Sequence, residues 1–136
     1  MKASWQRAAV SGDVETIERL LMTGEPTASE LLNSKDRFGQ TALMLASMRG
    51  HIAVVEALVR HGAALNHTAK FNLSALMLAV INNHQEIVKI LVEAGADRNI
   101  QGSGAPGFYQ KTALALAQAR GDEQMVQNLS GHTAIG

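Results

Sequence analysis

The chain repeats a short motif at regular spacing, and this repetition limits the folds available to it. Thr-Ala-Leu-Met-Leu-Ala at residues 41–46 returns as Ser-Ala-Leu-Met-Leu-Ala at 74–79 and as Thr-Ala-Leu-Ala-Leu-Ala at 112–117. Gly12 and Gly50 align in the same way, so four units follow one another at spacings of 38, 33 and 38 residues. Units of this length must stack on their neighbours to bury an apolar face, which predicts a solenoid.

Each unit has the sequence pattern of two helices joined by a tight turn. In the second unit we predict a short helix over residues 42–49 and another over 52–60, because apolar residues recur on one face of each. Gly50 and His51 lie between them, and glycine accepts the left-handed conformation that often ends a helix. Residues 63–72 are polar and contain turn formers, which predicts an extended, hairpin-like connector.

Hydroxyl side chains precede the first helix of three units, where they suit the N-cap position: Thr41, Ser74 and Thr112. Two insertions of five residues lengthen the connectors. The first, within residues 25–32, predicts a short helical turn capped by Thr27 or Ser29. The second, within residues 101–110, is expected to project over a partner, because long loops in compact repeats are often functional.

These motifs resemble ankyrin repeats. The resemblance rests on Asp-Arg-Phe-Gly-Gln-Thr-Ala-Leu at 36–43 and on the Gly-His, Val-Val, Leu-Val and Gly-Ala pairs within 50–63, and it extends over nearly the whole chain. It implies an all-α ankyrin-repeat solenoid of helix-turn-helix units with hairpin-like connectors. The family's Thr-Pro-Leu-His signature is altered, because the units lack its proline and the histidine that bonds between repeats.

We predict a single ankyrin-repeat domain over 1–136, with units at approximately 1–33, 34–66, 67–99 and 100–136. The first unit lacks the opening motif and is expected to cap the array. The tail, 131–136, is expected to fray or to fold back as a second cap.

Composition and motifs favour a binding protein over an enzyme. The absence of cysteine excludes disulfides, thiolate metal ligands and a cysteine nucleophile. There is no phosphate-loop or dinucleotide motif and no histidine with metal-ligand spacing, so we predict no catalytic residue, no metal and no cofactor. No apolar run has membrane-spanning length and no signal peptide is visible. We expect a soluble protein, cytoplasmic by default; export after removal of a signal peptide is compatible with the sequence.

Several conspicuous residues have a structural interpretation that we prefer. His51 and His84 share one repeat position, where a turn-stabilising role is favoured over metal binding. Met44 and Met77 recur at a helical packing position and are expected in the core. The glycine-rich run 102–107 has no preceding strand, so a loop is favoured over a phosphate site.

The resemblance implies that partners bind to the connector tips and to the concave face lined by the first helices. The candidate partner-binding residues are those that differ between units at these positions, while the repeat motif itself stays constant. The connectors contribute Arg37, Phe38, Gln40, Lys70, Phe71, Leu73, Phe108, Tyr109 and Lys111. The first helices contribute Met48, Arg49, Ile81, Asn82 and Arg120.

Three aromatic residues occupy equivalent connector positions, namely Phe38, Phe71 and Tyr109. We expect them to form an exposed row across successive tips, where each ring would bury roughly 150–250 Å² on binding. The alternative is that each ring packs against its own connector and stiffens it.

Charge is distributed unevenly, although the chain has 12 basic and 12 acidic residues. The predicted binding face contains Arg37, Arg49, Lys70, Lys111 and Arg120, whereas the second helices carry Glu15, Glu18, Glu56, Glu86 and Glu93. A basic face would steer an acidic protein partner toward it, and ordinary solvated charge explains the pattern equally well. The basic residues are too sparse to follow a phosphate backbone, so neither nucleic acid nor a membrane is an expected partner.

We interpret the chain as a non-catalytic protein–protein interaction module that is monomeric when unbound. It would regulate or inhibit its partner by covering an active or interaction surface, as an inhibitor, antidote or immunity-type regulator does. The alternative is an adaptor or scaffold fragment of a larger ankyrin-containing protein.

Overall fold

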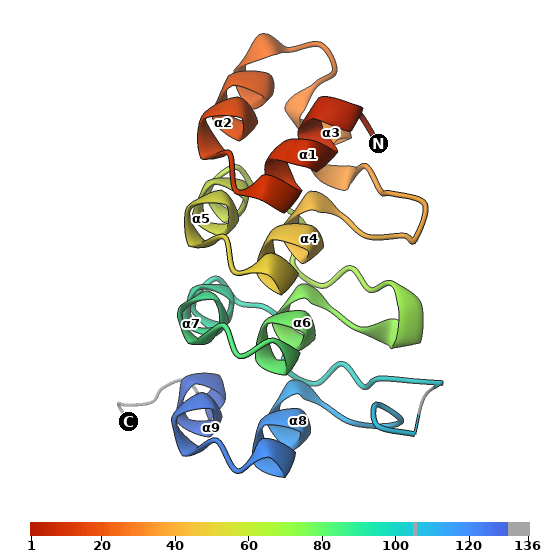
Figure 1. Ribbon diagram of the computed structural model, residues 1–136, viewed down its shortest axis with the longest axis vertical. Coiled ribbons are helices and arrows are strands. Elements are labelled where there is room, and N and C mark those ends of the chain that lie inside the picture. Colours follow the sequence, from red (N-terminus) through yellow and green to blue (C-terminus); the bar gives the residue numbers. More distant parts are fainter. Residues whose placement is uncertain (105, 131–136) are drawn as a thin grey trace.

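Helix pairs stack along the long axis of the molecule, and their connectors project to one side (Figure 1). The computed structural model describes residues 1–104 and 106–130, so the prediction for the tail, 131–136, lies outside these residues. Within them the chain is helical and contains no strand, apart from an isolated antiparallel bridge between Thr68 and Ser74. The predicted all-α repeat solenoid is confirmed.

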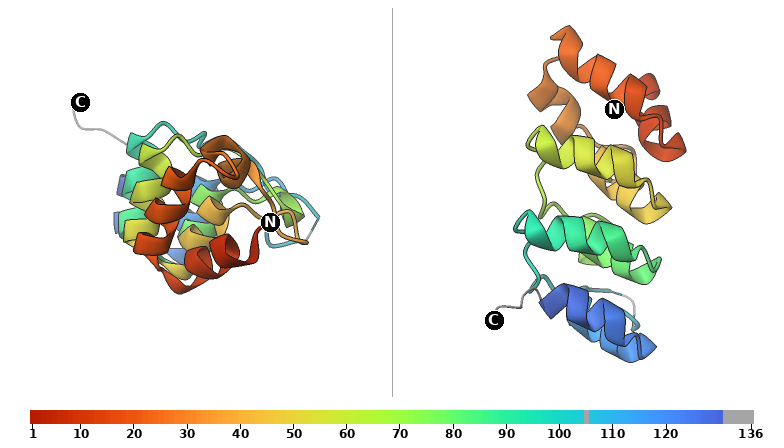
Figure 2. Two further views of the ribbon diagram at one scale, coloured as in Figure 1. Left: turned by 90° about the horizontal axis from the view of Figure 1, so that it is seen from above. Right: turned by 90° about the vertical axis from the view of Figure 1, so that its left-hand side faces the viewer.

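The helices form two layers (Figure 2). The first layer contains α1 (Ala3–Ser11), α4 (Ala42–Arg49), α6 (Ala75–Ile81) and α8 (Ala113–Arg120). The second layer contains α2 (Val14–Thr23), α5 (Ile52–Arg60), α7 (Gln85–Glu93) and α9 (Glu123–Ser130). The connectors hold α3 (Ala28–Asn33) and a 3-10 turn, η1 (Lys70–Asn72). Each helix packs on its pair partner and on the next helix of its own layer, and α4 and α5 have the predicted bounds.

Side-chain caps begin the first helix of three units, as predicted. The hydroxyl groups of Thr41, Ser74 and Thr112 accept hydrogen bonds from the backbone N–H three residues further on, at 3.3, 3.3 and 3.1 Å. Thr27 caps α3 and exchanges hydrogen bonds with Glu30, which confirms the helical turn predicted in the first insertion. Each cap of this kind stabilises a helix by about 1 kcal/mol.

The core lies between the two layers and continues from one unit to the next. Met44 and Met77 are each 1% exposed, which confirms that they belong to the core. The first helix of the last unit contributes less to this core, because α8 buries only two small side chains, those of Ala113 and Ala117. In contrast α4 buries six residues, including three large apolar ones.

Polar side chains contact backbone carbonyls of the preceding unit. The three carbonyls occupy equivalent positions, each two residues before the turn between paired helices. The contacts join the His51 ring to Val10, the His84 ring to Met48 and the Arg120 guanidinium to Ile81, at 2.7, 3.0 and 3.1 Å. The role predicted for the two histidines was to stabilise a turn; the structure shows instead that each ring joins two units. They thereby bond consecutive repeats, although the units lack the histidine of the family's signature.

Candidate functional site

The candidate binding residues lie at opposite ends of the first helices. The connectors precede each first helix, whereas Met48, Arg49 and their equivalents lie at its C-terminal end. Because α4 has 8 residues, the two groups are about 12 Å apart along it. We therefore treat them separately. We call Arg37, Phe38, Gln40, Lys70, Tyr109 and Lys111 the fingertip surface.

Two rings of the fingertip surface are open to solvent. Phe38 is 64% exposed and Tyr109 is 60% exposed, so neither is part of the core. The guanidinium of Arg37 lies 5.4 Å from the centre of the Phe38 ring, within the range of a cation–π contact. An aromatic face and a positive charge are thus presented together on the connector that precedes α4.

The tip that carries Phe38 is held in place by local hydrogen bonds. The Asp36 carboxylate accepts bonds from the backbone N–H groups of Phe38 and Gln40, at 2.9 and 2.8 Å. The His67 ring, from the next connector, lies 3.0 Å from the carbonyl oxygen of Gly39. This support fixes the backbone beneath the Phe38 ring before any partner binds.

The connector that precedes α6 and the connector that precedes α8 are joined to each other through Phe71. Its ring packs on that of Phe108, with centres 5.5 Å apart and planes tilted by 40°. The Phe71 carbonyl accepts a hydrogen bond of 2.8 Å from the Ser103 N–H, and the Asn72 amide donates one of 2.9 Å to Gln101. Phe71 is half-buried, so the expected row of three exposed rings is not formed. The alternative prediction was that each ring packs against its own connector. The Phe71 ring does pack, but against the next connector.

The other connector candidates differ in accessibility. Leu73 is 7% exposed and belongs to the core. The prediction that its side chain contacts a partner is therefore wrong. Leu73 is buried because the chain passes from η1 into α6 at this residue. Gln40 and Lys111 are half-buried, and the Lys70 ammonium lies 5.0 Å from the centre of the Phe71 ring.

At the opposite end of the first helices, the candidate residues mostly serve the fold. Arg120 bonds to the preceding unit, and the Asn82 amide donates to the Leu78 carbonyl of its own helix at 2.8 Å. Met48 and Ile81 are half-buried. Arg49 is exposed, and within 1–104 and 106–130 no hydrogen bond or ion pair engages its guanidinium.

Neither a metal centre nor a membrane span emerges from the described residues. Among them, no group of three or more His, Cys, Asp or Glu side chains could hold a metal ion. No helix in this part of the chain is both long and apolar enough to cross a membrane.

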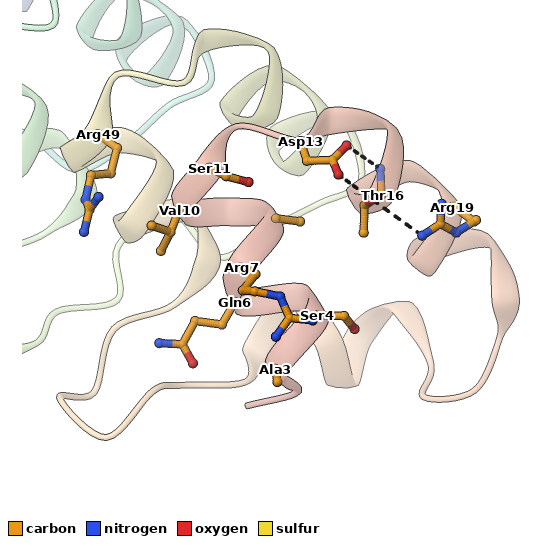
Figure 3. A pocket seen from close by; sticks show the side chains of 11 residues that line it. Ala3, Ser4, Gln6, Arg7, Val10, Ser11, Asp13, Thr16, Arg19 and Arg49 are labelled. Carbon is orange, nitrogen blue, oxygen red and sulfur yellow. Dashed lines mark hydrogen bonds between the residues drawn. The ribbon is translucent and has the colours of Figure 1, made fainter.

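Sequence reasoning missed a hollow on the first unit, between α1 and α2 (Figure 3). The signal for it was Arg7, which aligns with Leu45 and Leu78 when Gly12 is aligned with Gly50. Both leucines are buried, whereas Arg7 is exposed.

Stacked helix pairs with projecting connectors define an ankyrin-repeat array, which is a protein–protein interaction module. A family model described as ankyrin repeats, in three copies, matches residues 5–102. The chain belongs to the ankyrin-repeat family.

Two curated relatives match parts of the chain. The ankyrin repeat-containing protein YIL001W of Saccharomyces cerevisiae is 42% identical over 53 residues, which are 39% of this chain and 9% of the relative. Inversin of Danio rerio is 38% identical over 61 residues, which are 45% of this chain and 6% of inversin. The chain therefore spans less than a tenth of the length of either relative.

A solved structure matches almost the whole chain. It is the complex of the Bd0816 predatory endopeptidase from Bdellovibrio bacteriovorus with the immunity protein Bd3460. The superposition has a TM-score of 0.80 at 25% sequence identity and covers 94% of this chain and 62% of the matched chain.

Proposed function

We propose that the chain is a non-catalytic binding protein that regulates or inhibits a partner protein through its fingertip surface. The observation that carries the proposal is the exposure of Phe38 and Tyr109 on connectors held by hydrogen bonds. Exposed rings on a rigid support lose little entropy on binding and often supply binding hot spots. The cations of Arg37, Lys70 and Lys111 favour an acidic partner surface.

The structural neighbour supports inhibition as the form of regulation. It is a complex of an endopeptidase with an immunity protein, and it superposes on nearly all of this chain. By analogy, this chain would cover a functional surface of a partner enzyme, with a peptidase as the first class to test. We propose that the unbound chain is a monomer.

The curated relatives favour a second candidate function. Each is many times longer than the segment it shares with this chain, so related repeats also occur inside large proteins. There the array would be an adaptor or scaffold that brings proteins together without altering their activity.

The test begins with the double variant Phe38→Ala/Tyr109→Ala. Partners recovered on the wild-type chain are compared quantitatively with those recovered on the variant, and recovery of the specific partner is expected to fall about tenfold or more. The melting temperature should stay close to that of the wild type, because neither ring is part of the core. Unchanged recovery would place the binding face elsewhere.

The recovered partner then separates the two candidate functions. If the chain is an inhibitor, stoichiometric addition suppresses the partner's enzymatic activity, and the double variant does so only at about tenfold higher concentration. A scaffold instead leaves the activity unchanged and retains a third protein in the same complex.

A further inference from the structure

The hollow on the first unit is lined by side chains from three helices. It has a volume of about 850 Å³, lies between α1 and α2, and extends to Arg49 at the end of α4 (Figure 3). This volume is in the range of pockets that bind ligands. Its wall along α1 consists mostly of small side chains, which leave the space open: Ala3, Ser4, Ala8 and Ser11.

Positive charge dominates the lining. Arg7, Arg19 and Arg49 are exposed there, and Asp13 is the one carboxylate among the lining residues. Asp13 is already engaged, because its oxygens accept hydrogen bonds from the Thr16 hydroxyl at 2.7 Å and from the Thr16 N–H at 3.1 Å. These bonds hold the pKa of Asp13 below its ordinary value and fix its charge as a helix cap. The three guanidinium groups therefore leave a net positive charge in the hollow.

The other carboxylates of α2 do not neutralise this charge. Glu18 pairs with Arg60 and lies 2.9 Å from the His61 ring, both at the end of α5, and it does not line the hollow. Glu15 does not line it either. Among the described residues, no acidic side chain forms an ion pair with Arg7, Arg19 or Arg49.

The cap role expected for the first unit would explain why this face is polar but not why its charged groups are mostly of one sign. Gln6 and Arg7 of α1 align with residues that are buried in α4 and α6, namely Met44, Leu45, Met77 and Leu78. Polar residues of any charge would keep such a terminal face soluble. The lining instead combines three guanidinium groups with Val10 and alanine side chains.

We infer that this hollow, the arginine groove, is a second binding surface that takes an acidic segment of a partner protein. Guanidinium groups bind carboxylates in a bidentate geometry, and small apolar side chains accommodate the aliphatic parts of a peptide. The cations come from three helices, so an extended or helical segment with several carboxylates can reach more than one of them. Three cations are too few to follow a nucleic-acid backbone. The arginine groove is separate from the fingertip surface, and this inference does not depend on the function proposed for that surface.

The test uses an NMR titration of the isotope-labelled full chain with a synthetic peptide of about twelve residues, built from glutamate and alanine. Amide shifts are expected in α1, α2 and the end of α4, with little change in the connectors. The substitutions Arg7→Gln and Arg49→Gln together should weaken binding at least about fivefold, and about 200 mM salt should weaken it further. The matched control is Lys89→Gln, which removes an exposed cation from α7 and should leave the titration unchanged.

Three results would overturn the assignment. One is the absence of shifts in α1 and α2 at millimolar peptide. A second is an equal response to a peptide with glutamine in place of glutamate, and a third is stronger binding of a single-stranded oligonucleotide at the same residues. Circular dichroism melts check that the glutamine variants are folded. Because Phe38→Ala/Tyr109→Ala should leave this titration unchanged, failure of the fingertip proposal and failure of this one are distinguishable.

Discussion

At the residue scale, the glycine in the turn between paired helices leaves space for a histidine ring of the next unit. Gly50 has a φ of 83°, and a Cβ added there would lie 2.6 Å from the His84 ring of the following unit. Gly12 is related to His51 in the same way, at 2.6 Å. At these two turns glycine is therefore required for two reasons, the backbone conformation and the space that the histidine of the next unit occupies.

Replacing Gly50 with alanine tests both requirements. The left-handed conformation alone costs a non-glycine residue about 1 kcal/mol or more, and displacement of the His84 ring adds to this. The control is Gly24→Ala, because Gly24 has a φ of 84° but no atom within 4 Å of the added Cβ. Urea denaturation should show a larger loss of unfolding free energy for Gly50→Ala than for Gly24→Ala. Equal losses would mean that the contact between Gly50 and His84 contributes nothing.

At the element scale, the connectors are where sequence-based prediction was least complete. Register within the helices follows from apolar periodicity, so the bounds of α4 and α5 could be predicted. The alignment also placed Phe38 and Tyr109 on exposed connectors. It could not place Phe71, whose burial depends on the path of the second insertion and on a positive φ of 61° at Phe71 itself. Neither property leaves a periodic pattern in the sequence.

The contact between Phe71 and Phe108 is predicted to order the connector that precedes α8. In Phe71→Ala the ring contact is lost, so hydrogen exchange of the Ser103 and Gln110 amides should accelerate by about tenfold or more. Both amides are hydrogen-bonded within this region, Ser103 to the Phe71 carbonyl and Gln110 to Gly102. Tyr109→Ala is the control, because its exposed ring is not part of the contact. If exchange of Ser103 stays slow in Phe71→Ala, the backbone bonds alone hold the connector.

At the scale of the whole molecule, the repeat period of the sequence predicts the fold, but it does not predict where a binding surface lies. Repetition predicted the solenoid because each unit must bury its apolar face on the next. The arginine groove escaped prediction because it belongs to the first unit, where the sequence departs from the repeat. The first helices of the first and last units differ in kind: α1 keeps a fully buried Trp5, while α8 buries only Ala113 and Ala117.

This asymmetry predicts that the array opens from its C-terminal end. Met125 and Leu58 are both fully buried, the first in α9 and the second in α5, and replacing either with alanine should cost about 2–5 kcal/mol. In an array where units contact only their neighbours, Met125→Ala should lower hydrogen-exchange protection in α8 and α9 while α4 and α6 keep most of theirs. Leu58→Ala, in an interior unit, should lower protection on both sides of the substitution. If Met125→Ala lowers protection equally from α1 to α9, the units unfold together, and stability would have to be treated as a property of the whole chain rather than as a sum over units and interfaces.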